Sequence, residues 1–139
     1  MSEILIVNAP YYKDISDMLL EGAQKVLNTH GMSYDILEVP GALEIPAVIA
    51  MASDAFSGFI ALGCVIRGET SHYDIVAGES ARAIMDLTTH KNLCIGNGIL
   101  TCENSNQAIV RADPKQNNKG ADAANAALAL IQIKKRFLK

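Results

Sequence analysis

Segment 62–74 brings several chemically active side chains into one loop that follows an apolar run. It reads Leu-Gly-Cys-Val-Ile-Arg-Gly-Glu-Thr-Ser-His-Tyr-Asp. Histidine is the side chain best suited to give and take protons near neutral pH. Arg67 and Thr70 can donate hydrogen bonds to phosphate or carboxylate oxygens, and backbone N–H groups ahead of a helix add further donors. The segment therefore predicts an anion-binding loop in which His72 moves protons.

The composition limits the classes of protein that this chain can represent. It has 139 residues, half of them hydrophobic, which predicts one domain, 1–139, with a substantial core. The net charge is −3 and the only cationic cluster is at the C-terminal end, so nucleic acid is not an expected partner. The sequence has no bilayer-length apolar run and no secretion signal at its start. We therefore expect a cytoplasmic protein that does not bind membranes.

The three cysteines of the chain are Cys64, Cys94 and Cys102. Their number is odd and none of them forms a C-x-x-C pair. Disulfide frameworks and zinc sites both need paired cysteines at defined spacings. We therefore expect free thiols in a reducing compartment, and no metal site built from these residues.

Short apolar runs alternate with segments of helical periodicity along the chain. The apolar runs predict strands at Ile4–Asn8, 34–39, 58–65 and 92–96. Helical spacing predicts a first helix that stops at Gly31, a short helix capped by Asn104, and further helices at 43–51, 73–88 and 121–137.

Strands that alternate with helices predict a parallel sheet with right-handed crossovers. We therefore expect a three-layer α/β sandwich with helices on both faces and four strands in the order 2-1-3-4, which resembles the flavodoxin-like arrangement. Ligands bind such sheets at the carboxyl ends of the strands where the strand order reverses, here between the first and third strands. Loops 9–13, 40–44 and 66–72 meet at that edge, so segment 62–74 ends where this architecture places its site.

Some known uses of this architecture do not fit the residues at that edge. Loop 9–13 lacks the hydroxyls and glycines of a flavin mononucleotide site, and the third strand ends in Cys64-Val65 where a phospho-receiver has an aspartate. The chain has no G-x-G-x-x-G, P-loop or G-x-S-x-G motif. Gly96 and Gly98 form an isolated G-x-G, which indicates a bend or a close backbone approach.

Five motifs together resemble the lumazine synthase family, whose members catalyse the penultimate step of riboflavin synthesis. They are Val-Pro-Gly-Ala-Leu-Glu-Ile-Pro at 39–46, segment 63–74, Gly-Ile-Leu-Thr at 98–101, Gln107-Ala108 with Arg111, and Asn-Lys-Gly at 118–120. The resemblance covers nearly the whole chain. It implies the condensation of 5-amino-6-ribitylaminouracil with 3,4-dihydroxy-2-butanone 4-phosphate, with release of phosphate and water and with no metal or cofactor.

The resemblance also implies roles for charged and polar residues. His72 matches the family's catalytic histidine, which implies general acid–base work. Thr70 and the backbone of Glu69 match a phosphate loop, Arg111 matches an arginine that clamps the phosphate, and Lys119 matches a site lysine. Simpler roles stay open: Thr70 could cap a helix, Arg111 could form a surface salt bridge, and Lys119 could be solvated.

Two further runs match the segments that contact the ribityl chain and the pyrimidine ring: Ala42, Leu43 and Glu44 for the first, and Cys64, Val65 and Ile66 for the second. Cys64 is then a wall residue rather than a nucleophile, and Glu44 could instead be only a favourable first-turn carboxylate. Tyr11 falls where the family has a stacking phenylalanine. Asn97 falls where many members have an aromatic residue from the neighbouring subunit. Arg67 stays open between a structural and an anion-binding role.

The family builds its site between the subunits of a ring of five, and some members pack twelve rings into a shell. Shell-forming members carry an extra N-terminal strand, whereas the first strand expected here begins at Ile4. The resemblance therefore implies a homopentamer with sites shared between adjacent subunits. Two alternatives remain: an archaeal-type riboflavin synthase of the same fold, and a flavin- or lumazine-binding scaffold without turnover.

Overall fold

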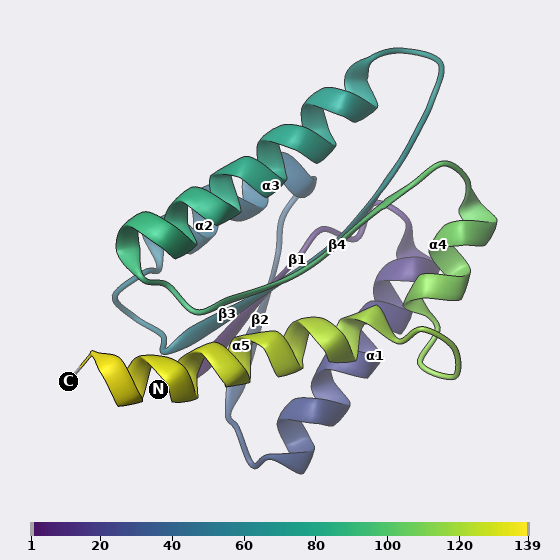
Figure 1. The fold of residues 1–139 in the computed structure, drawn as a ribbon. Coiled ribbons are helices and arrows are strands. Elements are labelled where there is room, and N and C mark those ends of the chain that lie inside the picture. The colour runs from purple at the N-terminus through teal and green to yellow at the C-terminus, as the bar shows by residue number, and fades with distance from the viewer. Residues whose placement is uncertain (1, 139) are drawn as a thin grey trace.

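The computed structural model describes residues 2–138, and a four-stranded, all-parallel sheet forms its centre (Figure 1). The strands are β1 (Ile4–Asn8), β2 (Tyr34–Glu38), β3 (Gly58–Ile66) and β4 (Ile95–Cys102), in the spatial order β2-β1-β3-β4. The predicted strand order and the parallel arrangement are confirmed. β1 is buried along its whole length, as its continuous apolar run predicts.

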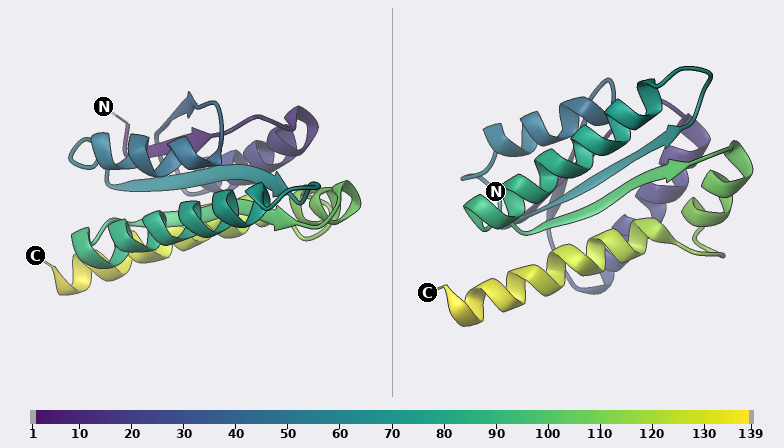
Figure 2. Two further views of the ribbon diagram at one scale, coloured as in Figure 1. Left: turned by 90° about the horizontal axis from the view of Figure 1, so that it is seen from above. Right: turned by 45° about the horizontal axis from the view of Figure 1, so that its top comes forward.

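Helices cover both faces of the sheet, which gives three layers (Figures 1 and 2). One face packs against α1 (Lys13–Thr29), α4 (Ser105–Ala112) and α5 (Lys119–Phe137), and the other against α2 (Ile45–Met51) and α3 (His72–Lys91). A one-turn 3₁₀ helix, η1 (Ala42–Glu44), leads directly into α2. Each face of the sheet has its own hydrophobic core, and β1 contributes side chains to both. Ile4 and Ile6 point to the face covered by α1, while Leu5 and Val7 point to the face covered by α2, because successive residues of a strand point to opposite faces.

Local signals place several of the boundaries. Gly31 has a φ of +67° and ends the α1 turn, as predicted, and the Asn104 side chain accepts a hydrogen bond from the Gln107 backbone N–H at the start of α4. The predicted fourth strand, 92–96, is wrong in its bounds. Asn92 is the left-handed C-cap of α3, and β4 starts later and continues to Cys102.

The bounds of β4 differ because its two glycines lie inside the strand rather than in a bend. A Cβ added at Gly96 would overlap the backbone carbonyl of Ala123, and one at Gly98 would press on Leu62 and Ala123. Helix α5 therefore packs directly onto the backbone of β4. The G-x-G motif predicted either a bend or a close backbone approach, and the structure shows the close approach. The strand therefore continues through both glycines.

We expect Gly96→Ala to destabilise the fold, because the new methyl group has to displace the α5 backbone. Overpacking of this kind typically costs about 1–3 kcal/mol. Urea unfolding followed by circular dichroism would measure the loss. Gly78→Ala is a matched control, since Gly78 lies in α3 with no atom near its Cβ position, and alanine favours helix there. Equal stability of the two variants would contradict the close packing of α5 on β4.

Candidate active site

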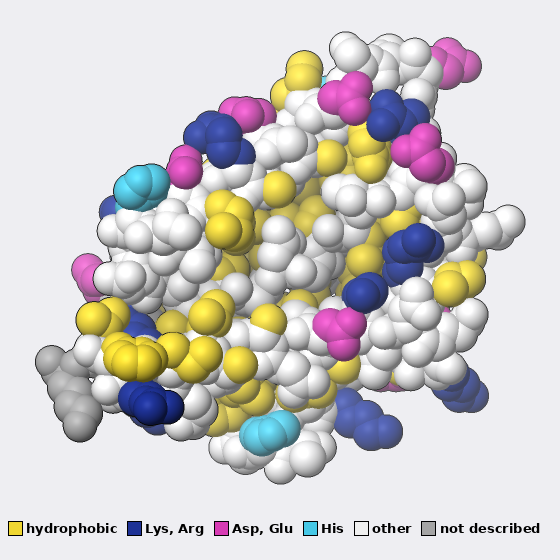
Figure 3. Space-filling model, viewed as in Figure 1, with side chains coloured by type: hydrophobic (Ala, Val, Ile, Leu, Met, Phe, Trp, Pro, Cys, Tyr) yellow, Lys and Arg dark blue, Asp and Glu magenta, His cyan; other side chains and the backbone are white. Residues whose placement is uncertain are grey.

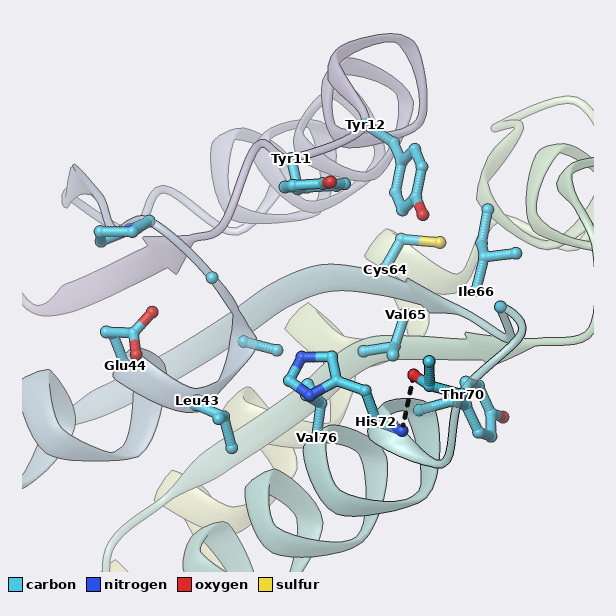
Figure 4. A pocket seen from close by; sticks show the side chains of 15 residues that line it. Tyr11, Tyr12, Leu43, Glu44, Cys64, Val65, Ile66, Thr70, His72 and Val76 are labelled. Carbon is cyan, nitrogen blue, oxygen red and sulfur yellow. Dashed lines mark hydrogen bonds between the residues drawn. The ribbon is translucent and has the colours of Figure 1, made fainter.

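A cavity of about 440 Å³ lies at the carboxyl edge of the sheet, between the ends of β1 and β3 (Figure 4). This is the switch point predicted from the strand order. Three segments line it: the loop after β1, the turn that contains η1, and the end of β3 with the start of α3. The predicted residues on its walls are Tyr11, Ala42, Leu43, Glu44, Cys64, Val65, Ile66, Thr70 and His72.

His72 is the first residue of α3, and its imidazole points into the cavity (Figure 4). The Thr70 hydroxyl accepts a hydrogen bond of 3.2 Å from the backbone N–H of His72. The N-cap of α3 is Ser71, whose side chain makes no cap hydrogen bond, so Thr70 is not the N-cap residue. Thr70 lies one residue earlier, and its hydroxyl satisfies one free N–H group of the first helical turn. The His72 side chain is exposed, so its ring is accessible to a ligand in the cavity.

Tyr11 and Tyr12 form an aromatic corner opposite His72 (Figure 4). Their ring centroids are 4.9 Å apart and the planes meet at 79°, the edge-to-face arrangement that aromatic pairs prefer. Burial, and then the neighbouring Tyr11 and Cys64, raise the pKa of Tyr12, so its hydroxyl stays protonated as a donor. Tyr12 was not predicted as a site residue. The signal available in the sequence was its position beside Tyr11, which was predicted to stack on a ligand.

A buried polar pair lies beneath this corner. Asn8, at the end of β1, and Ser16, in the first turns of α1, are 2–3% exposed and exchange hydrogen bonds of 2.8 and 3.0 Å. A buried amide without a partner would be costly, so the pair favours one orientation of α1 against β1. The loop that carries Tyr11 and Tyr12 spans these two anchors and is positioned by them.

Cys64 lines the cavity as a protonated thiol. Burial, and then the neighbouring Cys102, raise the pKa of Cys64 to about 12. A thiol with such a pKa is a poor nucleophile at neutral pH, because the thiolate is the reactive form. This supports the interpretation of Cys64 as a wall residue. Burial also raises the pKa values of Cys94 and Cys102, and all three cysteines are free thiols.

We expect iodoacetamide at pH 8 to alkylate Cys64 far more slowly in the native protein than in urea-unfolded protein. The raised pKa leaves almost no thiolate in the native state at that pH. Mass spectrometry of peptides quenched at intervals would measure the rates, and the Cys64→Ser variant would show which signal belongs to this residue. Rapid native labelling of Cys64 would contradict the wall interpretation and indicate an activated thiol.

The Glu44 carboxylate faces the cavity from the η1 side (Figure 4). It is exposed, and within residues 2–138 no cation lies close enough to form an ion pair with it. A carboxylate in this state can accept hydrogen bonds from ligand hydroxyls. Ala42 is buried and Leu43 is 40% exposed, so this turn presents one apolar and one acidic side chain to a ligand.

Four predicted site residues lie outside the cavity walls. Glu69 is exposed in the neighbouring loop, and the exposed Asn97 lies within β4, where its Oδ1 accepts a hydrogen bond of 2.9 Å from the Ile99 N–H. Arg111 lies in α4 and donates to the carbonyl of Gln107. Lys119 opens α5, and its Nζ atom is 3.4 Å from a carboxylate oxygen of Asp122. A single chain therefore does not bring Arg111 or Lys119 to His72.

Across residues 2–138, no group of three or more His, Cys, Asp or Glu side chains is arranged to hold a metal ion. In the same part of the chain, no helix is both long and apolar enough to cross a membrane.

The parallel sheet and the cavity at its switch point define a flavodoxin-like α/β protein with a small-molecule site. The model of the family described as 6,7-dimethyl-8-ribityllumazine synthase matches residues 2–135. The chain therefore belongs to this family, and it is an enzyme of riboflavin biosynthesis.

Relatives that carry the same description are similar over nearly their full length. A 6,7-dimethyl-8-ribityllumazine synthase from Bartonella bacilliformis is 59% identical over 138 residues, which cover 96% of this chain and 91% of the relative. One from Zymomonas mobilis is 54% identical over 139 residues, which cover 99% of each chain. This agreement over the whole length supports the resemblance inferred from the five motifs.

Proposed function

We propose that the cavity between β1 and β3 is where this chain condenses 5-amino-6-ribitylaminouracil with 3,4-dihydroxy-2-butanone 4-phosphate. The products are 6,7-dimethyl-8-ribityllumazine, phosphate and water. The observation that carries the proposal is the meeting of three separate segments around one cavity, with the His72 imidazole and the Tyr11 ring both on its walls, in a chain of this family. The names of the relatives favour this condensation over the riboflavin synthase and scaffold alternatives.

The pyrimidine end of the site is proposed to lie beside the Tyr11–Tyr12 corner. The Tyr11 ring is 75% exposed, so one of its faces is free to stack on a heterocycle. Ile66, Val65 and Cys64 would form the wall beside that ring, largely through their backbone. The ribityl hydroxyls would lie along η1, where Ala42 and Leu43 give an apolar surface and the Glu44 carboxylate accepts hydrogen bonds.

The phosphate end is proposed to lie at the start of α3, beside Thr70 and the backbone of Glu69. The N-terminus of a 20-residue helix favours negative charge there. His72 would move the protons for amine addition, phosphate elimination and ring closure. None of these steps needs a protein nucleophile. Holding two reactants in register contributes several kcal/mol, and up to about 7–11 kcal/mol in the best cases.

We also propose that the site is completed by a neighbouring subunit in a homopentamer. Arg111, Lys119 and Asn97 lie away from the cavity of their own chain, so they could serve the cavity of an adjacent chain. The chain also exposes large apolar side chains that a subunit contact would cover. Figure 3 shows hydrophobic side chains gathered over α3 and α5. The exposed large apolar residues of these two helices include Met85, Ile133 and Phe137, whose exposed fractions are 52–70%.

A cytoplasmic location and one functional domain over 1–139 complete the proposal. Three free thiols fit a reducing compartment. The family match over residues 2–135, together with one sheet shared by all the strands, supports a single functional unit.

Purified protein supplied with both substrates should produce fluorescent lumazine and an equal amount of inorganic phosphate. Absence of lumazine formation, with both substrates intact, would contradict the proposed reaction. Riboflavin formed from lumazine alone would favour the riboflavin synthase alternative. Tight binding of lumazine without turnover would favour the scaffold alternative.

A further inference from the structure

Arg67 lies just after β3, outside the cavity walls, and forms a compact cluster of contacts that includes Tyr73, a residue of the cavity wall. Its Nε atom donates to both carboxylate oxygens of Glu103, at 3.0 and 3.1 Å. Its Nη1 atom is 3.3 Å from a carboxylate oxygen of Asp74, and the guanidinium lies 4.3 Å from the centre of the Tyr73 ring. The Arg67 backbone N–H also donates to the carbonyl of Cys102, at 3.0 Å. One residue therefore contacts four others through charge, stacking and backbone.

These contacts connect the turn that carries His72 to the end of the sheet. Tyr73 and Asp74 directly follow His72 in the first turn of α3, whereas Glu103 follows β4. Glu103 is itself held, because its backbone N–H donates to the side-chain oxygen of Gln107 in α4, at 2.8 Å. A continuous set of contacts thus runs from β4 and α4, through one guanidinium, to the residues beside the imidazole.

The charges of the cluster argue against an anion-binding role for Arg67. Its cation is shared between the carboxylates of Glu103 and Asp74, so the three groups together carry a net negative charge that disfavours a phosphate. Arg67 is also absent from the cavity walls, whereas Gly68 and Thr70 in the same loop are on them. The sequence left Arg67 open between a structural and an anion-binding role. The direction of its guanidinium, toward two carboxylates and away from the cavity, favours the structural role.

We propose that Arg67 is a positioning residue, whose contacts with Glu103, Asp74 and Tyr73 hold the loop 67–72 so that His72 faces the bound substrates. This inference rests on the proposed role of His72 in proton transfer. The side chains of the ion pairs are 41–62% exposed, so each pair contributes little to the stability of the fold. The contribution is to the order of the loop, and small errors of placement cost much more in rate than in stability.

The central experiment compares Arg67→Met, Glu103→Gln and the double variant. We expect Arg67→Met to lower kcat by about tenfold or more, with the KM for the phosphate-bearing substrate within about twofold of wild type. The double variant should be no slower than Arg67→Met, because the two residues act through one contact and their effects are then not additive. Arg67→Lys should recover only part of kcat, since lysine keeps the charge but lacks the planar fork.

Two further readouts separate positioning from direct binding. Hydrogen–deuterium exchange of the amides in 68–74 should become faster in Arg67→Met, and the inhibition constant for inorganic phosphate should stay unchanged. Arg82→Met is the matched control, because Arg82, like Arg67, pairs with two carboxylates, those of Glu79 and Asp86, but it lies beside α2 and outside the walls of the candidate site. It should leave kcat and the exchange of 68–74 at wild-type values.

Three outcomes would overturn the proposal. A phosphate inhibition constant that rises about tenfold in Arg67→Met, with unchanged exchange, would make Arg67 a phosphate ligand. Full turnover in Arg67→Met would show that the cluster does not position His72, as would additive losses in the double variant. A wild-type protein without turnover would instead contradict the proposed function, while the exchange rates would still report on the order of the loop.

Discussion

Replacing His72 with asparagine is expected to lower kcat by about 10²–10⁴-fold, the range over which a positioned acid–base group typically accelerates a reaction. Asparagine keeps a polar side chain at the first position of α3 but cannot carry a proton between reacting groups. The Thr70 hydroxyl would still accept from the backbone N–H of residue 72, so the helix start should be unaffected. Steady-state turnover, followed by lumazine fluorescence, measures the effect.

The control for this variant is a second polar group on the cavity wall. Glu44→Gln removes the charge that faces the proposed ribityl side of the cavity, so it should raise the KM for the pyrimidine substrate more than it lowers kcat. His72→Asn should instead lower kcat strongly and leave the KM for the pyrimidine substrate nearly unchanged. An unchanged kcat in His72→Asn would remove this histidine from the mechanism, whatever the behaviour of Glu44→Gln.

Mixed rings of His72→Asn and Arg111→Ala subunits are expected to regain about one quarter of wild-type activity, although each variant alone is nearly inactive. If each site takes His72 from one subunit and Arg111 from the next, an intact site needs one subunit of each kind in a fixed order. In a random equal mixture this occurs at about one site in four. Refolding the mixed chains and assaying lumazine formation measures the recovery.

Each variant refolded alone is the baseline, and light scattering should give a mass near five times the 14.9 kDa of one chain. Subunits labelled with different isotopes would show by mass spectrometry that the rings contain both variants. Mixed rings that stay as inactive as the separate variants would mean that every subunit holds its own complete site. A dominant particle of about sixty chains would contradict the expectation that the homopentamers stay separate.

The secondary structure and strand order followed from local patterns and one general rule. The apolar run Ile4–Asn8 is buried on both sides, and β1, β2 and β3 lie within one residue of their predicted bounds. The order β2-β1-β3-β4 is the one expected from the flavodoxin-like arrangement, which right-handed crossovers on both faces of the sheet allow, and it places loops 9–13, 40–44 and 66–72 at one edge. The location of the cavity was therefore predictable from periodicity, chain order and the likeness to the flavodoxin-like arrangement.

Local sequence patterns did not predict the bounds of β4. Gly96 and Gly98 are compatible with a bend or with a strand, and the backbone of α5 decides between them by packing onto the strand at Ala123. That contact joins segments far apart in the chain, so no window of the sequence contains it. Tyr12 differs, because it lies beside Tyr11 in a loop whose two anchors, Asn8 and Ser16, are only eight residues apart, so its place on the cavity wall had a local signal.

The sequence by itself determined which segments form strands and helices, apart from the bounds of β4, because periodicity is a property of the chain. Together with the flavodoxin-like arrangement, it also predicted the meeting of Tyr11, Glu44 and His72 at one edge. Only the tertiary structure decided which side chains meet within that edge. Arg67 and Glu103 are 36 residues apart, and their contact depends on the register of β3 against β4. Whether a guanidinium binds a ligand or a carboxylate is a matter of a few ångströms, which only the packed structure specifies.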